Sequence, residues 1–200
     1  CISHASRMHL APRSRLDLAF ISAPCRLACS QLYLALVDGH TEWEQTECTL
    51  EIGADATDPR GFRMAAEGHP GFRAGGKHAG AARTAMHVIA RGVLMPGGRP
   101  VTKLLMVPSS GRRHQLRIHA LATGHPIIGD VAYTGDAAAP RMMLHAWRLM
   151  LPLPKAPQPL CVGTADPFPV ASAAADHNAQ PAAAANAQPA AAAAVAAIAA

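Results

Sequence analysis

Hydrophobic and polar positions alternate along several short runs of this chain, as they do in β-strands. Residues 31–37 combine that alternation with aromatic and β-branched side chains, and Asp38-Gly39 after them is typical of a turn. Further strands are predicted over residues 46–52, 84–90 and 101–107, the last entered through a hairpin turn at Pro96-Gly-Gly98. The pattern therefore predicts a protein built mainly on a β-sheet.

One segment departs from the alternation. Residues 114–122 are predicted as a short helix, which Gly124 ends in the C′ position with Pro126 beyond it. Residues 67–82 are rich in Gly and Ala and are predicted as a long loop. Strands and helices do not alternate regularly, and this argues against a doubly wound parallel sheet.

The pattern divides the chain into three parts. Residues 1–30 are poorly patterned, and residues 31–169 have the character of one globular domain. Residues 170–200 form an Ala-rich tail in which Asn-Ala-Gln-Pro-Ala-Ala-Ala-Ala occurs twice. Low complexity and almost no charge predict that this tail has no core of its own.

Charge and cysteine content narrow the class of protein. The chain has 18 Lys and Arg against 13 Asp and Glu, which favours a polyanionic partner. Its five Cys residues are odd in number and lack paired C-x-x-C spacing, so free intracellular thiols are expected, without a disulfide framework or structural zinc. No apolar span of membrane length occurs outside the Ala tract. Because the chain starts at Cys1 instead of Met, we expect a fragment that has lost any targeting segment.

The candidate chemistry is concentrated in Gly111-Arg-Arg-His-Gln-Leu-Arg-Ile-His119. This segment carries Arg112, Arg113, His114, Arg117 and His119. A glycine turn between a strand and a helix can direct backbone N–H groups and basic side chains at an anion. A solvated basic helix face would have the same composition. His114 and His119 are five residues apart, so they do not share a face as a zinc-binding pair would, and no metal is predicted.

The motif resembles the signature of the RluA-type RNA pseudouridine synthases. That signature continues through a G-H-P-[IV]-x-G-D segment, a Tyr and L-H-A, which correspond here to residues 124–130, Tyr133 and residues 144–146. Residues 33–39 are similar to the family's Y-L-A-L-V-x-G strand, and residues 58–61 and 82–84 to later segments. Residues 141–146 and 166–168 are most like one eukaryotic branch of the family. The resemblance spans residues 31–168.

The resemblance implies a fold and an activity. The fold is an α+β domain with a mainly antiparallel central sheet, flanking short helices and an RNA-binding cleft. The activity is isomerisation of uridine to pseudouridine in RNA, by an Asp-dependent mechanism that needs no cofactor. The implied partner is RNA, with no membrane association, and the protein is expected to be a monomer in an unspecified intracellular compartment.

The resemblance also assigns roles to particular residues. Tyr33 corresponds to the family's strand tyrosine, which contacts the base, and Arg117 to the arginine that pairs with the catalytic aspartate. On a helix, Arg117 can point into a cleft while Leu116 and Ile118 pack. The catalytic set is predicted to be Asp17, Tyr33 and Arg117, and the RNA-binding set Arg112, Arg113, His114 and Gln115.

The aspartate is the least well matched residue. The family's H-R-L-D segment precedes the strand tyrosine by about thirty residues, whereas Arg15-Leu16-Asp17 stands sixteen residues before Tyr33, and Ser14 replaces the histidine. Residues 1–30 are therefore interpreted as a degenerate or truncated part of the catalytic domain. Two alternatives stay open: a truncated or non-catalytic RNA-binding protein that keeps the fold, and a phosphate-binding module of another kind.

Overall fold

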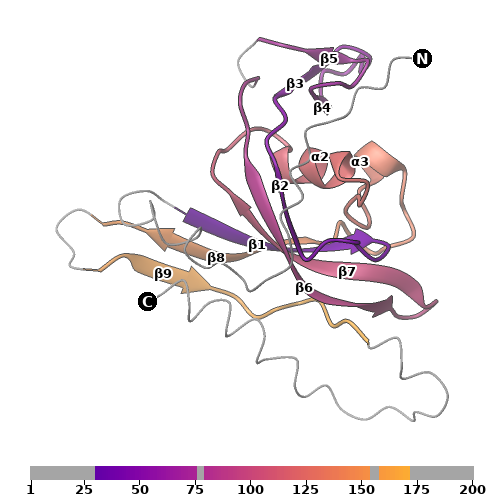
Figure 1. Cartoon of the computed structure of the whole chain (residues 1–200), viewed down its shortest axis with the longest axis vertical. Coiled ribbons are helices and arrows are strands. Elements are labelled where there is room, and N and C mark those ends of the chain that lie inside the picture. The colour runs from indigo at the N-terminus through magenta and orange to yellow at the C-terminus, as the bar shows by residue number, and fades with distance from the viewer. Residues whose placement is uncertain (1–29, 76–78, 154–157, 172–200) are drawn as a thin grey trace.

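Two antiparallel sheets organise the residues that the structure, a computed structural model, describes: 30–75, 79–153 and 158–171 (Figure 1). The larger sheet has six strands in the order β2-β6-β7-β1-β8-β9. Their bounds are β1 Ser30–Asp38, β2 Gln45–Cys48, β6 Thr84–Leu94, β7 Arg99–Pro108, β8 Leu144–Leu151 and β9 Leu160–Gly163. The smaller sheet has the order β4-β3-β5, with β3 Ile52–Asp55, β4 Met64–Ala66 and β5 Phe72–Arg73. The helices α2 Gln115–Ala122 and α3 Val131–Thr134 lie between the two sheets (Figure 1).

The predicted strands at 31–37 and 101–107 are confirmed and are direct neighbours. In the pairing of β1 with β7, Tyr33 lies opposite Met106 and Leu34 opposite Leu105. β1 is central, since β8 pairs with its other edge. A central strand covered on both faces explains why four consecutive residues, Leu34 to Val37, are all buried.

The predicted hairpin around Pro96-Gly-Gly98 is also confirmed. It joins β6 to β7, which pair over their whole length from Thr84 opposite Pro108 to Leu94 opposite Arg99. Gly97 and Gly98 both have positive φ, of 106° and 63°, which glycine adopts without a side-chain penalty. The strand expected at 84–90 continues four residues further than the prediction.

The single strand predicted over 46–52 is wrong. β2 ends at Cys48, and β3 starts at Ile52 in the other sheet. β2 pairs with β6, whereas β3 pairs with β4 and β5. The apolar alternation runs through the junction, so the pattern alone does not mark the change of sheet. The loop predicted over 67–82 is mostly irregular, but it contains the short strand β5.

The predicted helix is confirmed within one residue, and it ends as expected. The cap residue Thr123 is followed by Gly124 at φ 83°, the left-handed conformation typical of a C′ glycine. The prediction missed α3, β4, β8 and β9. All strand pairs of the described residues are antiparallel, so the predicted class, a mainly antiparallel sheet with short helices, is confirmed.

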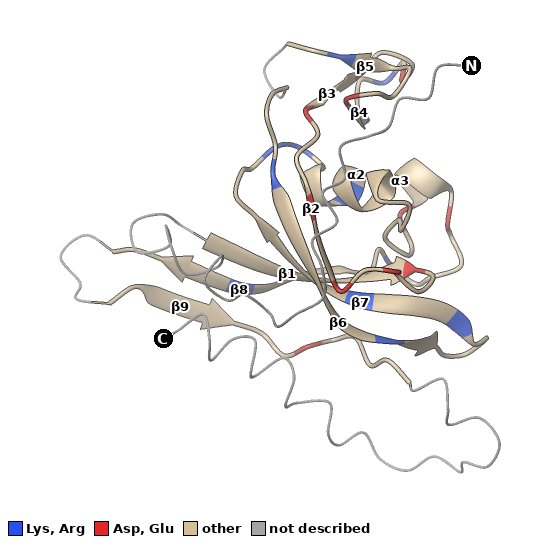
Figure 2. Ribbon diagram, viewed as in Figure 1, with Lys and Arg blue, Asp and Glu red and all other residues tan. Residues whose placement is uncertain are grey.

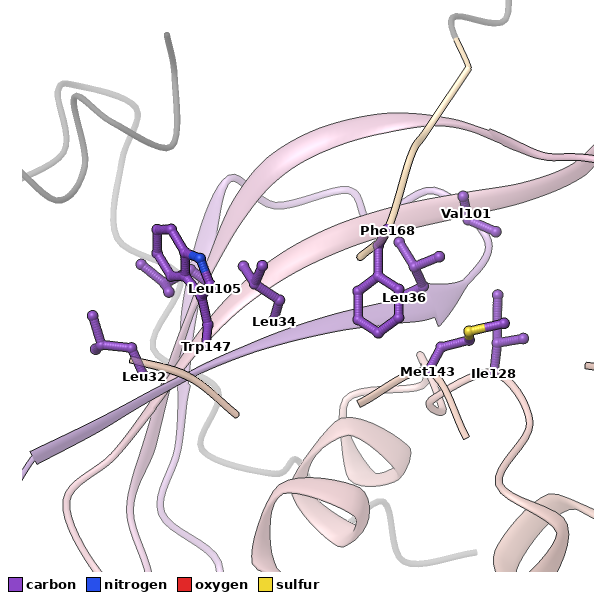
Figure 3. Packing of buried hydrophobic residues seen from close by; sticks show 9 residues of the cluster. All are labelled: Leu32, Leu34, Leu36, Val101, Leu105, Ile128, Met143, Trp147 and Phe168. Carbon is purple, nitrogen blue, oxygen red and sulfur yellow. The ribbon is translucent and has the colours of Figure 1, made fainter. Parts of the chain in front are cut away.

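The two faces of the larger sheet bury separate cores, because side chains alternate along β1. Ala35 and Val37 face α2 and pack with Leu116, Ala120 and residues of β6 and β7. Leu34 and Leu36 face the opposite side. That second core is shown in Figure 3 and comprises Leu32, Leu34, Leu36, Val101, Leu105, Ile128, Met143, Trp147 and Phe168.

The segment after β9 covers part of this second core. Phe168 is 2% exposed and lies beside Leu36 and Met143 (Figure 3). Asp166 fixes the segment, because its carboxylate accepts a 2.6 Å hydrogen bond from the buried Lys103 ammonium. Ala171 pairs with Val93 in an isolated bridge.

The domain limits of 31 and 169 stay a prediction, and residues 1–29 lie outside the described part. No helix among the described residues has the length and apolar character needed to cross a membrane.

Candidate functional site

An open pocket of about 220 Å³ lies on the α2 face of the larger sheet. It is bordered by β1, the start of β8 and the turn between β7 and α2. Its lining residues are Gln31, Tyr33, Pro108, Ser110, Gly111, Arg112, His114, Gln115, Leu116, Arg117 and Leu144. Five of the seven predicted site residues therefore border one space. Arg113 lies beside it, and Asp17 lies outside the described residues.

Side-chain alternation along β1 brings Tyr33 to the pocket, because Tyr33 shares the α2 face with Ala35 and Val37. Beside it, the register between β1 and β8 shifts between Leu32 and Tyr33, and Trp147 is the extra residue on β8. Tyr33 is half-buried, and its hydroxyl donates to the Gln31 carboxamide, which also lines the pocket. The aromatic ring is thus held at the pocket with part of its surface accessible.

The Gln115 side chain organises the turn that precedes α2. Its Oε1 accepts hydrogen bonds from the Ser110 hydroxyl at 2.9 Å and the Arg112 backbone N–H at 3.0 Å. Its Nε2 donates to the Arg83 carbonyl at 2.9 Å and the Thr84 hydroxyl at 3.0 Å. Gln115 was predicted to bind RNA, but it is only 4% exposed and both ends of its amide are occupied. The geometry makes it a positioning residue for the turn.

The buried His119 extends this network. Its Nε2 lies 3.1 Å from the Leu50 carbonyl, an acceptor, so Nε2 carries the proton. Its Nδ1 then accepts from the Thr84 hydroxyl at 2.8 Å. Burial lowers the pKa of His119 and keeps it neutral. His119 therefore links α2 to β6 and to the segment before β3, and it does not reach the pocket lining.

His114 adopts a backbone conformation that the sequence does not reveal. It precedes α2 at φ 57° and ψ 18°, the left-handed region that residues other than glycine rarely enter. Its Nδ1 lies 2.8 Å from the Tyr133 hydroxyl, which accepts the Met64 backbone N–H at 2.9 Å. Burial, helped by Arg117 and Arg113, lowers the pKa of His114 to about 4. The ring is therefore neutral at pH 7 and is held by its hydrogen bond with the Tyr133 hydroxyl.

Arg117 is held by a buried carboxylate. Its Nε and one terminal nitrogen donate to the two oxygens of Asp130, at 2.8 and 2.6 Å. The side chains are only 13% and 2% exposed. The guanidinium also lies over the Tyr133 ring, 4.6 Å from its centroid. This parallel pairing fixes the plane of the guanidinium more strictly than a single contact would.

Arg117 keeps hydrogen-bonding capacity for a further anion. A guanidinium has five N–H donors, and Asp130 takes two of them. Arg117 also lines the pocket. No Asp or Glu stands among the described residues that line the pocket. The fixed arginine can therefore receive a carboxylate or phosphate from outside the described set.

The two other arginines of the motif differ in their surroundings. Arg112 is exposed, and its Nε donates to the Ala81 carbonyl at 3.1 Å. Arg113 lies over the ring of Phe62, 5.2 Å from the centroid. Figure 2 shows Lys and Arg at α2 and also on β5, β6, β7 and β8, so positive charge is not confined to the pocket.

Asp130 and Tyr133 are the site residues that sequence reasoning missed. Both belong to the signature quoted above, but neither was assigned a role. Their position thirteen and sixteen residues after Arg117 gives no periodic signal. The turn that ends α2 and the short α3 bring them against Arg117.

The remaining histidines of the motif region contact other groups. His125 makes a hydrogen bond to the Asp38 carbonyl, and His145 makes one to the Thr164 hydroxyl. Among the residues described, no group of three His, Cys, Asp or Glu is placed to hold a metal ion.

Comparisons with known proteins agree with the resemblance. The chain is 38% identical over 144 residues to mouse RNA pseudouridylate synthase domain-containing protein 1, covering 70% of this chain and 44% of that protein. It is 38% identical over 121 residues to the dual-specificity RNA pseudouridine synthase RluA of Pasteurella multocida, covering 58% and 48%. The solved structure of human RNA pseudouridylate synthase domain containing 1 superposes with a TM-score of 0.62 at 35% identity, covering 70% of this chain and 56% of that one. No family model matches the chain.

The chain is therefore related to the RluA-type pseudouridine synthases. The mouse and human proteins belong to the eukaryotic branch that residues 141–146 and 166–168 resemble. It spans less than half the length of the mouse and Pasteurella proteins.

Proposed function

We propose that this relative of the RluA-type enzymes acts on RNA as a pseudouridine synthase. The observation that carries the proposal is the convergence of Tyr33 and Arg117 on one pocket, with Arg112 and His114 at its border. These residues come from separate segments of the chain, and the resemblance implies that they belong to one site. Their convergence supports a common function.

The chemistry requires a uridine to leave the RNA stack. Enzymes that act on a base inside folded nucleic acid flip it into a pocket and read it there by stacking and hydrogen bonds. The half-buried ring of Tyr33 offers a surface on which uracil can stack. The reaction then breaks the bond from N1 to C1′, turns the base, and joins C5 to C1′. It is an isomerisation, so no atom is gained or lost and no organic cofactor is needed.

The reaction also needs a carboxylate beside C1′, and we assign this role to Asp17. A guanidinium close to a carboxylate keeps it ionised near pH 7, ready to act as nucleophile or base. Arg117 has donors left after its pairing with Asp130. Asp130 itself is a positioning residue, because both its oxygens are engaged by Arg117 and it does not line the pocket.

The arginines beside the pocket suit the RNA backbone. Arg112 and Arg113 flank the turn before α2 and have no acidic partner among the described residues. Lysines and arginines that neutralise phosphates release counterions and make binding salt-dependent. The neutral His114 keeps Nε2 for a hydrogen bond to the RNA, because Nδ1 is the nitrogen that faces Tyr133. The whole surface would thus hold the RNA while the pocket takes the base.

Conversion of uridine to pseudouridine in RNA by the chain and by Asp17→Asn tests the proposal. The unaltered chain should convert a uridine, and Asp17→Asn should bind RNA equally well without converting it. Equal conversion by both proteins would remove Asp17 from the mechanism. The isosteric amide is the suitable variant because it changes the charge and keeps the shape.

A second candidate, a non-catalytic RNA-binding protein, is favoured by one observation. Arg117 already has a carboxylate partner in Asp130, so the described pocket is held together without a catalytic aspartate. In this case neither protein would convert uridine, whereas replacing Arg112 and Arg113 with Ala would weaken RNA binding. The slope of log affinity against log salt should then fall by roughly one for each lost phosphate contact. The absence of RNA binding would contradict both candidates.

A further inference from the structure

The loop between β3 and β4 exposes an aromatic ring next to the pocket. Phe62 is 44% exposed, and its ring centroid lies 4.8 Å from that of His114, which lines the pocket. The Arg113 guanidinium lies over the same ring at 5.2 Å. One side chain thus separates this exposed aromatic from the space proposed to receive the uridine.

The loop is built to hold Phe62 outward. The Asp58 carboxylate accepts the backbone N–H groups of Arg60, Phe62 and Arg63, at 3.2, 2.8 and 2.6 Å. These bonds, the one from Arg63 first, lower the pKa of Asp58 and keep it ionised. Gly61 supplies the positive φ of 62° that the turn requires. The local backbone therefore fixes the exposure of the ring.

Phe62 differs from the other aromatic residues that lie under an arginine. Trp147 under Arg148 and Phe168 under Arg141 are buried, at 6% and 2% exposure, and Tyr133 under Arg117 is half-buried against a third core cluster. Those pairs cover parts of the hydrophobic core. Phe62 contributes to none of the described core clusters. Its exposed ring has no packing role comparable with that of Trp147 or Phe168.

The charge around Phe62 favours an anionic partner. Arg113 and Arg60 have no acidic partner among the residues described, whereas Arg63 pairs with the buried Asp55 at 3.3 Å. Aromatic rings and guanidinium planes next to one another are the surfaces on which unpaired RNA bases stack. When one uridine is flipped out, its neighbours lose stacking partners and need new ones.

We infer that Phe62 and Arg113 form a second RNA contact, on which a nucleobase flanking the target uridine stacks while Arg60 and Arg113 meet adjacent phosphates. The inference rests on the proposed function, because it places the target uridine in the pocket. It adds a contact for the flanking sequence to a site that otherwise reads the flipped base alone.

The test measures binding of a short fluorescent single-stranded RNA with one central uridine. Phe62→Ala should weaken binding by roughly 5- to 150-fold, the range for loss of one stacked base. The salt dependence should stay unchanged, because stacking displaces no counterion. Leu160→Ala is the matched control. Leu160 is an apolar residue of β9 with 46% exposure, and its replacement should leave affinity unchanged.

A second measurement needs no variant. An abasic nucleotide beside the central uridine should weaken binding to the unaltered protein by the same factor, and should cause no further loss with Phe62→Ala. Equal affinity of Phe62→Ala and unaltered protein, while Arg112→Ala weakens binding, would overturn the Phe62 contact and leave the proposed function standing. Failure of the unaltered protein to bind the RNA would overturn both.

Discussion

The two faces of the six-stranded sheet bury their side chains on different principles. On the α2 face, polar groups are buried together with apolar ones, and Gln115, His119 and Asp130 all have hydrogen-bond partners. On the opposite face the core cluster is apolar, with Phe168 as part of its cover (Figure 3), and the buried Lys103 on that face is paired with Asp166. The same strands serve both faces, since neighbouring residues of β1 point to opposite sides.

Two buried histidines, one on each face of the sheet, show this difference between the faces. His119, on the α2 face, uses both ring nitrogens. His87 lies opposite Leu105 of the second core and is 7% exposed, and neither of its ring nitrogens has a hydrogen-bond partner among the described residues. Buried polar groups without partners are destabilising. The α2 face thus places its polar groups to position the pocket, and the opposite face contributes stability through apolar burial.

The largest effect is expected from Asp130→Asn. The amide keeps the shape but leaves Arg117 buried without a counter-charge, which typically costs about 3–5 kcal/mol. The free energy of unfolding, measured in urea, should fall by that amount, and RNA conversion should be lost with it. A loss below about 1 kcal/mol would show that the buried Arg117 does not need Asp130 as its counter-charge. It would contradict the claim that the α2 face depends on paired polar groups.

Phe168→Ala should have a somewhat smaller effect, confined to stability. Removing a fully buried phenylalanine typically costs about 3–5 kcal/mol, and the segment after β9 can partly collapse into the space. Unfolding in urea should show a loss near the lower end. At temperatures where the variant is folded, its RNA affinity should equal that of the unaltered chain. Weaker binding would mean that the opposite face also shapes the pocket.

The two histidines should respond with opposite signs when each is replaced by leucine. His119→Leu leaves the Thr84 hydroxyl and the Leu50 carbonyl without their present partner and should cost about 1–3 kcal/mol. His87→Leu removes two buried nitrogens that have no partner in the described part of the chain, and it should stabilise by about 1 kcal/mol. Thermal unfolding of both variants at pH 7.5 measures the difference. Destabilisation of equal size in both would contradict the contrast.

A further effect is a loss of stability in mild acid. Burial lowers the pKa of His87 and His119, and that of His114 to about 4 from an ordinary value of 6.5. Between these values the unfolded chain takes up protons that the folded protein does not, so stability falls as pH drops from 6.5 towards 4. The melting temperature should therefore decrease from pH 7 to pH 5. The decrease should be smaller in His87→Leu, and an identical decrease would exclude His87 as a contributor.

The elements with strong local signals could be predicted from the sequence. β1 and β7 contain apolar runs that are typical of buried strands, and α2 ends before Gly124 as its C′ signal indicates. The pocket residues Tyr33 and Arg117 were recognised because they lie in a motif of fixed order.

Features set by distant contacts could not be predicted. Nothing local separates β2 from β3, which become partners of different sheets. The positive φ of His114 is imposed by the turn that Gln115 holds and by the contact with Tyr133. The pairing of Arg117 with Asp130 arises from the fold of the intervening turn and is invisible to periodicity.

Conversion of uridine to pseudouridine by Arg117→Lys tests the central claim that the α2 face holds a catalytic pocket. Lysine keeps the positive charge but lacks the planar fork that pairs with Asp130 and a second carboxylate. The unaltered chain and Arg148→Ala, a control at an exposed position of β8, should both convert uridine. Arg117→Lys should be slower by on the order of a hundredfold, the effect of a misplaced catalytic group. Equal rates in all three proteins, or no conversion by the unaltered chain while RNA binding persists, would contradict the account.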